Sequence, residues 1–184
     1  MRLKKVAPTA LLVSVMLLVS ACVSVVPQPH ARNAPITPQE VTASKLADNV
    51  LQYLQKDGLP IGESFTYTVN NDPDALLGTG NQYIGKVTFK DTRVPSETSK
   101  SGIDVLDGGC IEIFANMKDA KATEAYITQA NQDGTLFSTE YDYWRGIILL
   151  RVTSQLTPAQ AHFYQAILTT YPLLSSPGQN AANT

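Results

Sequence analysis

Hydrophobic residues recur at helical spacing in three segments of the chain, and polar start signals precede them. Thr37-Pro38-Gln39-Glu40 forms a capping box with proline at the first helical position, and Thr157-Pro158-Ala159-Gln160 repeats this arrangement. A weaker helix is predicted to open at Asn116-Met117-Lys118-Asp119 and to stop near residues 131–134. The first helix should end at Gly58, and its buried stripe should consist of Ala43, Leu46, Ala47, Val50, Leu51 and Leu54.

The remaining apolar runs predict strands. They are the alternation of Phe65, Tyr67 and Val69, and residues 84–94, 110–114, 139–144 and 147–153. Arg145-Gly146 is the expected two-residue hairpin turn between the last two strands. From Cys110 onward the order is strand, helix, strand, strand, helix, which resembles a split βαβ, ferredoxin-like layout. We therefore expect an α+β fold, with an antiparallel or mixed sheet covered by helices.

The first twenty-two residues have the layout of a secretory signal peptide. Arg2, Lys4 and Lys5 precede an apolar stretch over residues 10–19, which is shorter than the roughly 20 apolar residues of a membrane-spanning helix. Val19-Ser20-Ala21-Cys22 looks like a bacterial lipobox, in which the thiol of Cys22 is linked to diacylglycerol and the leader is cleaved before it. The alternative is an ordinary signal peptide with a cysteine there by chance.

These signals divide the chain into four parts. We expect a lipoprotein signal peptide over residues 1–21, a lipidated, proline-containing tether over 22–36, a single globular domain over 37–174 and a flexible polar tail over 175–184. The predicted location is extracytoplasmic. The lipid on Cys22 would anchor the domain to the cell membrane, or to the outer membrane if the source has two membranes.

Composition narrows the classes of function. The chain is 43% hydrophobic and 16% charged, with 14 basic and 16 acidic residues, which is globular and argues against a nucleic-acid binder. Removing the three basic leader residues from 14 leaves 11 against 16, a net charge of −5 for the mature chain. An acidic domain gains nothing from an anionic membrane surface, so membrane attachment would depend on the acyl chains. Two cysteines are too few for a disulfide scaffold, and we assign no cofactor and no metal.

Three blocks of sequence carry a resemblance to a known family. They are Asn71-Asp72-Pro73-Asp74-Ala75-Leu76-Leu77-Gly78, Gly108-Gly109-Cys110-Ile111-Glu112-Ile113-Phe114, and residues 149–161, which read LLRVTSQLTPAQA. Together they resemble a family of small, uncharacterised surface lipoproteins, chiefly of Gram-positive bacteria. The resemblance implies a surface lipoprotein domain, and it supplies no established reaction, cofactor or catalytic residue.

Two acidic loops are candidates for oxygen-ligand chemistry. Asp72 and Asp74 flank a proline, and Asp104 and Asp107 lie in a second, glycine-containing loop. These carboxylates could hold calcium if the two loops converged, although neither has EF-hand spacing. The interpretation that we favour for Asn-Asp-Pro is a turn whose side chains bond their own backbone.

Single polar residues in the apolar segments have structural interpretations. We expect Cys110 to be a buried, inert thiol and His162 to be a half-exposed surface residue. Glu140 and Asp142 share one strand face with Trp144, which we interpret as a solvated face. Arg151 should lie at an exposed strand end or pair with a carboxylate, because an unpaired buried guanidinium is costly.

Tyr141, Tyr143 and Trp144 cluster near the predicted hairpin, where they could form a recognition patch, although core packing is the simpler interpretation. Two functions remain. The leading one is a non-enzymatic binding or accessory domain, with an envelope protein, a wall polymer or a small ligand as partner. The alternative is an envelope hydrolase or metal-dependent enzyme that uses the Asp72/Asp74 and Asp104/Asp107 loops, which requires those four carboxylates to converge.

Overall fold

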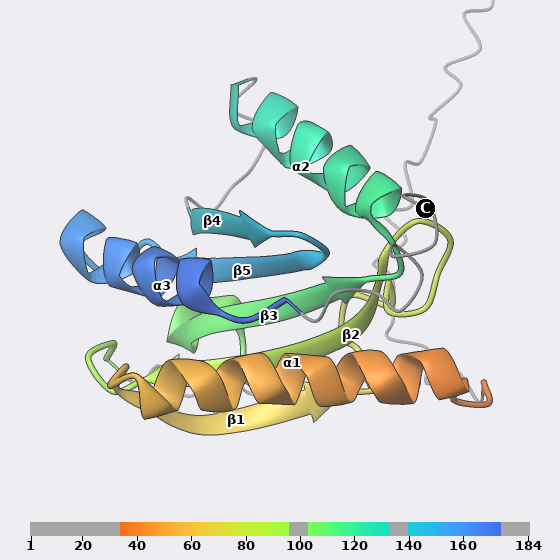
Figure 1. Cartoon of the computed structure of the whole chain (residues 1–184), viewed down its shortest axis with the longest axis horizontal. Coiled ribbons are helices and arrows are strands. Elements are labelled where there is room, and N and C mark those ends of the chain that lie inside the picture. Colours follow the sequence, from red (N-terminus) through yellow and green to blue (C-terminus); the bar gives the residue numbers. More distant parts are fainter. Residues whose placement is uncertain (1–33, 96–102, 133–139, 174–184) are drawn as a thin grey trace, which may run out of the picture.

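The computed structural model describes residues 34–95, 103–132 and 140–173. The predicted signal peptide, most of the predicted tether and the predicted tail lie outside the described residues. In chain order the described elements are α1 (Pro38–Lys56), β1 (Ile61–Tyr67), β2 (Tyr83–Asp91), the 3₁₀ turn η1 (Val105–Asp107), β3 (Gly108–Phe114), α2 (Met117–Gln132), β4 (Glu140–Arg145), β5 (Ile148–Thr153) and α3 (Pro158–Thr170) (Figure 1). The fold is α+β, as the sequence pattern predicts.

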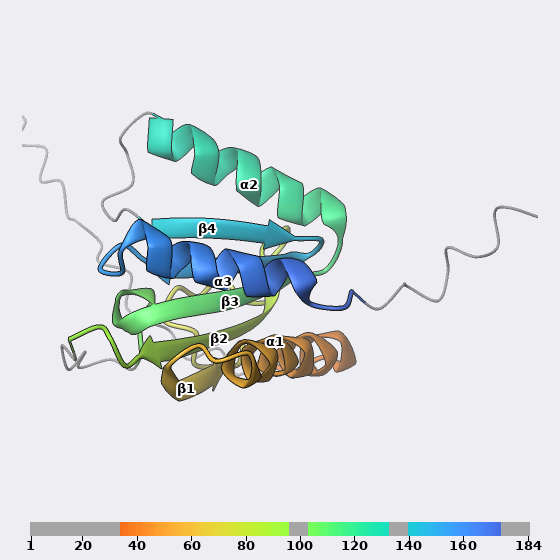
Figure 2. The same ribbon diagram turned by 60° about the vertical axis from the view of Figure 1, so that its left-hand side comes forward.

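The five strands form one sheet in the order β1-β2-β3-β5-β4 (Figure 1). Figure 2 shows β1 and β4 at its two edges. Every neighbouring pair is antiparallel. Since β5 is antiparallel to both β3 and β4, those two strands run parallel with β5 between them, and α2 connects them. This is the split βαβ arrangement expected for the second half of the chain.

The hairpin turn differs by one residue from the prediction. Arg145 pairs with Ile148, so the two turn residues are Gly146 and Ile147 rather than Arg145 and Gly146. Gly146 has φ +62°, a left-handed conformation that glycine adopts without steric cost.

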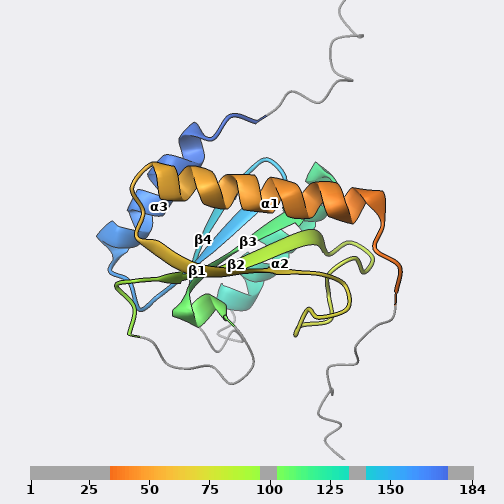
Figure 3. The ribbon, with the colours of Figure 1, turned by 90° about the horizontal axis from the view of Figure 1, so that it is seen from below.

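The helices cover both faces of the sheet, with α1 and α3 on one side and α2 on the other (Figure 3). Side chains alternate between the two faces of each strand, so each face receives its own set of residues. The face under α1 and α3 holds the larger core, which includes Val87, Phe89, Ile111, Ile113, Ile148, Leu150 and Val152. The main hydrophobic core therefore lies between the sheet and the two capped helices.

Both predicted capping boxes are present. In α1 the Thr37 hydroxyl accepts a hydrogen bond from the Glu40 amide, and the Glu40 carboxylate accepts one from the Thr37 amide. Thr157 and Gln160 make the equivalent pair at α3. These bonds satisfy amides that would otherwise have no partner in the first helical turn, which fixes where each helix begins.

The packing under α2 is sparser. A smaller cluster joins Ala120 near the start of α2 to Phe114 and Leu149 on the sheet, whereas Tyr126, two turns further along, is 69% exposed. Ile127 also packs against this smaller cluster, so α2 contacts the sheet through fewer buried apolar residues than α1 and α3 do. None of the described helices is long and apolar enough to cross a membrane.

Candidate functional site

The sheet face under α2 carries a row of charged side chains. Lys86 of β2 lies opposite Glu112 of β3, and Arg151 of β5 lies opposite Asp142 of β4. Glu140 precedes Asp142 by two residues and therefore faces the same side. Strand register thus gathers charges that are far apart in the sequence onto one surface.

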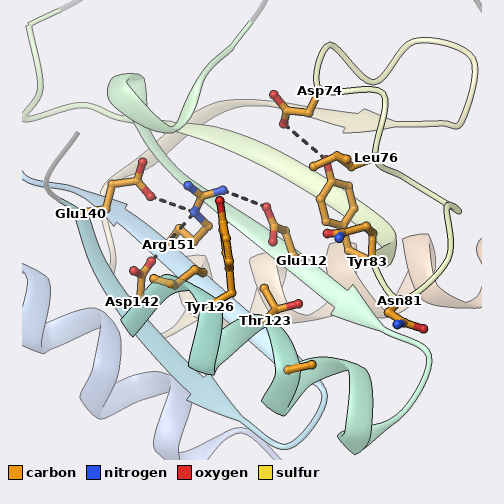
Figure 4. Close-up of a pocket in the computed structure, with 13 residues that line it drawn as sticks. Asp74, Leu76, Asn81, Tyr83, Glu112, Thr123, Tyr126, Glu140, Asp142 and Arg151 are labelled. Carbon is orange, nitrogen blue, oxygen red and sulfur yellow. Dashed lines mark hydrogen bonds and ion pairs between the residues drawn. The ribbon is translucent and has the colours of Figure 1, made fainter. Parts of the chain in front are cut away.

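Arg151 is the centre of the first ion-pair network (Figure 4). Its Nη1 donates to Oε1 of Glu112 at 3.1 Å, and its Nε donates to Oε2 of Glu140 at 2.8 Å. Oδ1 of Asp142 lies 3.9 Å from the same Nε. Of the two expected situations for Arg151, an exposed strand end or pairing with a carboxylate, the structure shows the pairing, and three carboxylates surround this one guanidinium.

One guanidinium does not offset the burial of these acids. Burial raises the pKa of Glu112 even though Arg151 and Lys86 act in the opposite direction. Burial also raises the pKa of Asp142 to about 6. The charge of Arg151 acts to lower this pKa, whereas the charges of Glu140 and Glu112 raise it further. Oδ1 of Asp142 is shielded from solvent and accepts no hydrogen bond from the described residues. Asp142 therefore carries a poorly neutralised charge at neutral pH.

The interpretation of Glu140 and Asp142 as a solvated strand face is wrong. The side chain of Glu140 is 6% exposed and that of Asp142 is 15% exposed. The alternation of residues along β4 correctly placed Glu140 and Asp142 on one face. It could not show that α2 and the neighbouring strands shield this face from solvent.

Lys86 is the centre of a second network, on β2. Its Nζ donates to Oδ1 of Asp72 at 2.9 Å and to Oδ2 of Asp74. The Tyr83 hydroxyl also donates to Asp72, at 2.9 Å. Nζ lies 5.1 Å from the ring centroid of Tyr67 and 5.3 Å from that of Tyr83. Two carboxylates and two aromatic rings thus enclose one ammonium group.

The Lys86–Asp72 pair is charged in the folded protein. Burial alone would raise the pKa of Asp72, but the Lys86 charge and the Leu77 amide outweigh it and lower that pKa. Burial alone would lower the pKa of Lys86, but the two aspartates contribute to raising it instead. Each partner holds the other in its ionised form.

Asp72 also forms the predicted turn. Its Oδ2 accepts hydrogen bonds from the amides of Leu76 at 3.0 Å and Leu77 at 2.9 Å. The turn interpretation of Asn-Asp-Pro is therefore confirmed. The same carboxylate fixes the β1–β2 loop and neutralises Lys86.

The second acidic loop has a separate, local role. The Asp104 side chain caps η1 by accepting from the Val105 amide, and Asp107 accepts from the Asp104 amide at 2.8 Å. No group of three or more His, Cys, Asp and Glu residues in the described ranges could hold a metal ion. Within those ranges, Asp72, Asp74, Asp104 and Asp107 do not form one cluster.

A cavity of about 760 Å³ separates α2 from this charged face. Figure 4 shows Glu112, Glu140, Asp142 and Arg151 on the sheet and Asp74 on the loop between β1 and β2. Tyr126 and Thr123 reach toward the sheet residues from α2. The lining residues in the described ranges are Asp74, Leu76, Asn81, Gln82, Tyr83, Glu112, Ala122, Thr123, Tyr126, Ile127, Glu140, Asp142 and Arg151. Four carboxylates and one guanidinium thus line a cleft that also has apolar and aromatic walls.

Cys110 lies beside this site and opposite Arg151 in the sheet, and it is 2% exposed. Burial, with Glu112 nearby, raises the pKa of its thiol well above the usual value. The prediction of a buried thiol is confirmed, and the raised pKa keeps that thiol protonated. His162 is exposed on α3, away from the cleft residues.

The three hairpin aromatics do not share one surface. Tyr143 is buried in the core under α1 and α3, and Tyr141 packs against the same core. Trp144 lies on the opposite face, with its ring centroid 5.8 Å from that of Phe114. The aromatic residue exposed at the cleft is instead Tyr126, which the sequence pattern did not single out.

Lys86 and Glu112 were also missed as site residues. The available signal was one charged residue in each of two otherwise apolar runs, IGKVTF and CIEIF. Such residues are buried only with partners, so each could have been read as half of an ion pair.

No protein-family model, curated protein or solved structure matches the chain. The resemblance to surface lipoproteins therefore stays a prediction, and a function has to be argued from the cleft and the leader sequence.

Proposed function

We propose that the protein is a lipid-anchored bacterial envelope lipoprotein whose globular domain binds a ligand in the cleft between α2 and the sheet. This proposal rests on the cavity of about 760 Å³ between α2 and the sheet. Its floor is the sheet side of the cleft, where Arg151 pairs with Glu112 and Glu140. Small-molecule sites have volumes of roughly 300–1,000 Å³ and combine apolar walls with a few convergent polar groups. The cleft has both properties.

The chemistry of the cleft supports binding rather than nucleophilic catalysis. A thiol or amine nucleophile needs a lowered pKa or an adjacent base. The pKa values of Cys110 and Lys86 are both raised, so both groups stay protonated at neutral pH. The carboxylates Asp72 and Asp74, which the hydrolase alternative would use, neutralise Lys86.

Anchoring is supported by the leader sequence. Basic residues, a short apolar stretch and Val19-Ser20-Ala21-Cys22 occur in the order that lipoprotein processing requires. Two or more acyl chains hold a protein firmly on a bilayer, whereas one chain holds it only marginally. The tether would then carry the domain away from the membrane surface.

Metabolic labelling tests the anchor. Cells that express the full chain are grown with an alkyne-tagged fatty acid, and the purified protein is analysed for label and intact mass. We expect label on the wild type and on the matched control Cys110→Ala, and no label and an uncleaved leader in Cys22→Ala. A wild-type product that is unmodified and starts at Met1 would refute the anchor.

Filling the cleft tests the binding function. Ala122 and Ala125 are both exposed on α2, but only Ala122 is among the described residues that line the cavity. The full chain, purified in detergent, is screened against a library of small organic fragments by thermal shift. Fragments that stabilise the wild type and Ala125→Trp, but not Ala122→Trp, support the proposal. A screen without any such fragment contradicts it.

A further inference from the structure

We propose that the cleft recognises an oligoamine, a flexible aliphatic chain that carries two or more ammonium groups. This inference rests on the proposed function, because it takes the cleft as the ligand site and adds the chemical class of the ligand. The charge balance of the cleft, two places for a cation, and the aromatic and apolar side chains that line the cavity support this class of ligand.

The floor of the cleft has more carboxylates than cations. Four carboxylates, those of Asp74, Glu112, Glu140 and Asp142, line the cavity with the one guanidinium of Arg151, which leaves an excess of three negative charges if every group is ionised. The α2 residues that line the cavity, Ala122, Thr123, Tyr126 and Ile127, are uncharged. Among the described lining residues, Arg151 is the only cation. A cationic ligand would supply the missing charge, whereas an anion would add to the repulsion.

Asp142 provides the first place for an ammonium group. Its Oδ1 accepts no hydrogen bond from the described residues and lies 3.9 Å from Nε of Arg151, beyond hydrogen-bond distance. A buried acceptor without a donor loses the free energy of a hydrogen bond, which a ligand ammonium would restore in charge-assisted form.

Asp74, on the loop between β1 and β2, provides the second place, at the other side of the cleft (Figure 4). Its side chain is 51% exposed, and its Oδ2 accepts from Lys86 and Tyr83. The Lys86 network stands on β2 and Asp142 on β4, three strand positions apart in the sheet. At about 4.8 Å between neighbouring strands, that separation is roughly 14 Å. One ligand can therefore reach both places only if its charges are spread along a chain.

The walls between these two places suit such a chain. Tyr126 is 69% exposed and Leu76 is 41% exposed, and both line the cavity with Ile127. Aliphatic segments bury apolar surface against leucine and isoleucine, and an aromatic ring attracts a cation placed over its face. The Lys86 ammonium is held by this same chemistry, between two aspartates and the rings of Tyr67 and Tyr83.

Calorimetric titration of the full chain, purified in detergent, tests the inference. The probes are butylamine, 1,4-diaminobutane and spermidine, which carry one, two and three ammonium groups, with glutarate as the anionic control. We expect affinity to rise at least tenfold from the monoamine to spermidine, and no binding of glutarate. Asp142→Asn should weaken spermidine binding about tenfold, and Ala122→Trp should abolish it.

The control variant is Glu63→Gln, which removes an exposed carboxylate of β1 that pairs with Lys90 outside the cleft. Spermidine affinity should not change in this variant. Equal losses in Glu63→Gln and Asp142→Asn would show attraction by overall charge alone and would overturn the inference. So would spermidine binding no tighter than butylamine.

Two further outcomes separate the possibilities. Tetralysine carries more ammonium groups than spermidine and places them on a peptide. If it binds the cleft more tightly than spermidine, the cleft recognises several ammonium groups on one flexible ligand, as inferred, and the natural source is a lysine-rich segment. If uncharged fragments bind in a manner that Ala122→Trp blocks while no amine binds, the proposed function stands and the oligoamine inference fails.

Discussion

Asp142 and Arg151 lie directly opposite each other on β4 and β5, yet Oδ1 of Asp142 stands 3.9 Å from the guanidinium Nε. Glu140 and Glu112 receive the hydrogen bonds of Arg151 instead. Asp142 is thus enclosed by the fold without being neutralised by it. A buried charge with incomplete pairing costs stability, and such positions occur preferentially at functional sites.

Replacing Asp142 by asparagine should stabilise the protein above pH 6. The pKa of Asp142 is about 6 in the folded state against 3.8 for an ordinary aspartate, so the folded protein holds a proton that the unfolded chain releases. The contribution of Asp142 to the free energy of unfolding is therefore fully present below about pH 4, and it is lost as the pH rises through about 6. The loss amounts to at most about 3 kcal/mol at pH 7.

Urea unfolding at pH 4.5, 6.0 and 7.5 checks this expectation. Asp142→Asn should be more stable than the wild type at pH 7.5, and the difference should shrink toward pH 4.5. Glu124→Gln removes an exposed carboxylate of α2 and serves as the matched control, with no such pH-dependent gain. A less stable Asp142→Asn protein at pH 7.5 would contradict the assignment of an uncompensated charge.

Amine binding should also depend on pH. Asp142 is faced by Arg151 of β5, Glu112 of β3 and Glu140 of its own strand, with Tyr126 of α2 lining the same cavity. An ammonium group binds the ionised carboxylate, so the affinity for 1,4-diaminobutane should rise about tenfold between pH 5 and pH 7. Titrations across that range check it. The Asp142→Asn protein should show a flatter profile, and an affinity that falls with rising pH would refute the role of Asp142.

The two ends of the domain are the parts that sequence patterns predict best. Thr37-Glu40 and Thr157-Gln160 fix the starts of α1 and α3 through bonds between residues three positions apart, and such local bonds can be read directly from the sequence. The split βαβ order follows equally from element order. The hairpin turn was misplaced by one residue because the register of Arg145 with Ile148 depends on pairing along the whole strand.

The charged cleft is less accessible to sequence reasoning. Arg151 contacts Glu112, which lies 39 positions earlier, and Lys86 contacts Asp72 across a loop. Each residue alone fits an exposed strand position. Only strand order and register bring them together, and only the placement of α2 converts the face into an enclosed site. The pattern therefore gave pairing with a carboxylate as one of two expectations for Arg151, without its partners, and it assigned Asp142 to solvent.

Lys86→Met should destabilise the protein strongly. The substitution leaves the Asp72 carboxylate, whose side chain is 0% exposed, without its cation. Breaking one side of a buried ion pair costs about 3–5 kcal/mol. The loss should appear as a lower urea midpoint, and Lys86→Met/Asp72→Asn should recover part of it. Lys90→Met, at the exposed pair with Glu63, is the control and should leave the midpoint unchanged. Equal effects at Lys86 and Lys90 would show that the buried network contributes little.

The close contact between Gly85 of β2 and α1 gives a test of the packing on the sheet face opposite the cleft. A Cβ atom on Gly85 of β2 would lie 2.6 Å from the backbone carbon of Ala43, so Gly85→Ala forces the helix away from the strand that carries Lys86. We expect the free energy of unfolding, measured with urea, to fall by about 1–3 kcal/mol. A well-packed interface can accommodate an extra methyl group only if the backbone moves. Gly62→Ala in the edge strand β1 is the matched control: its new methyl would meet the Thr92 side chain at 3.4 Å, an ordinary contact, so the midpoint should hold or rise slightly. If Gly85→Ala were as stable as Gly62→Ala, α1 would have to pack on β2 less tightly than the structure shows.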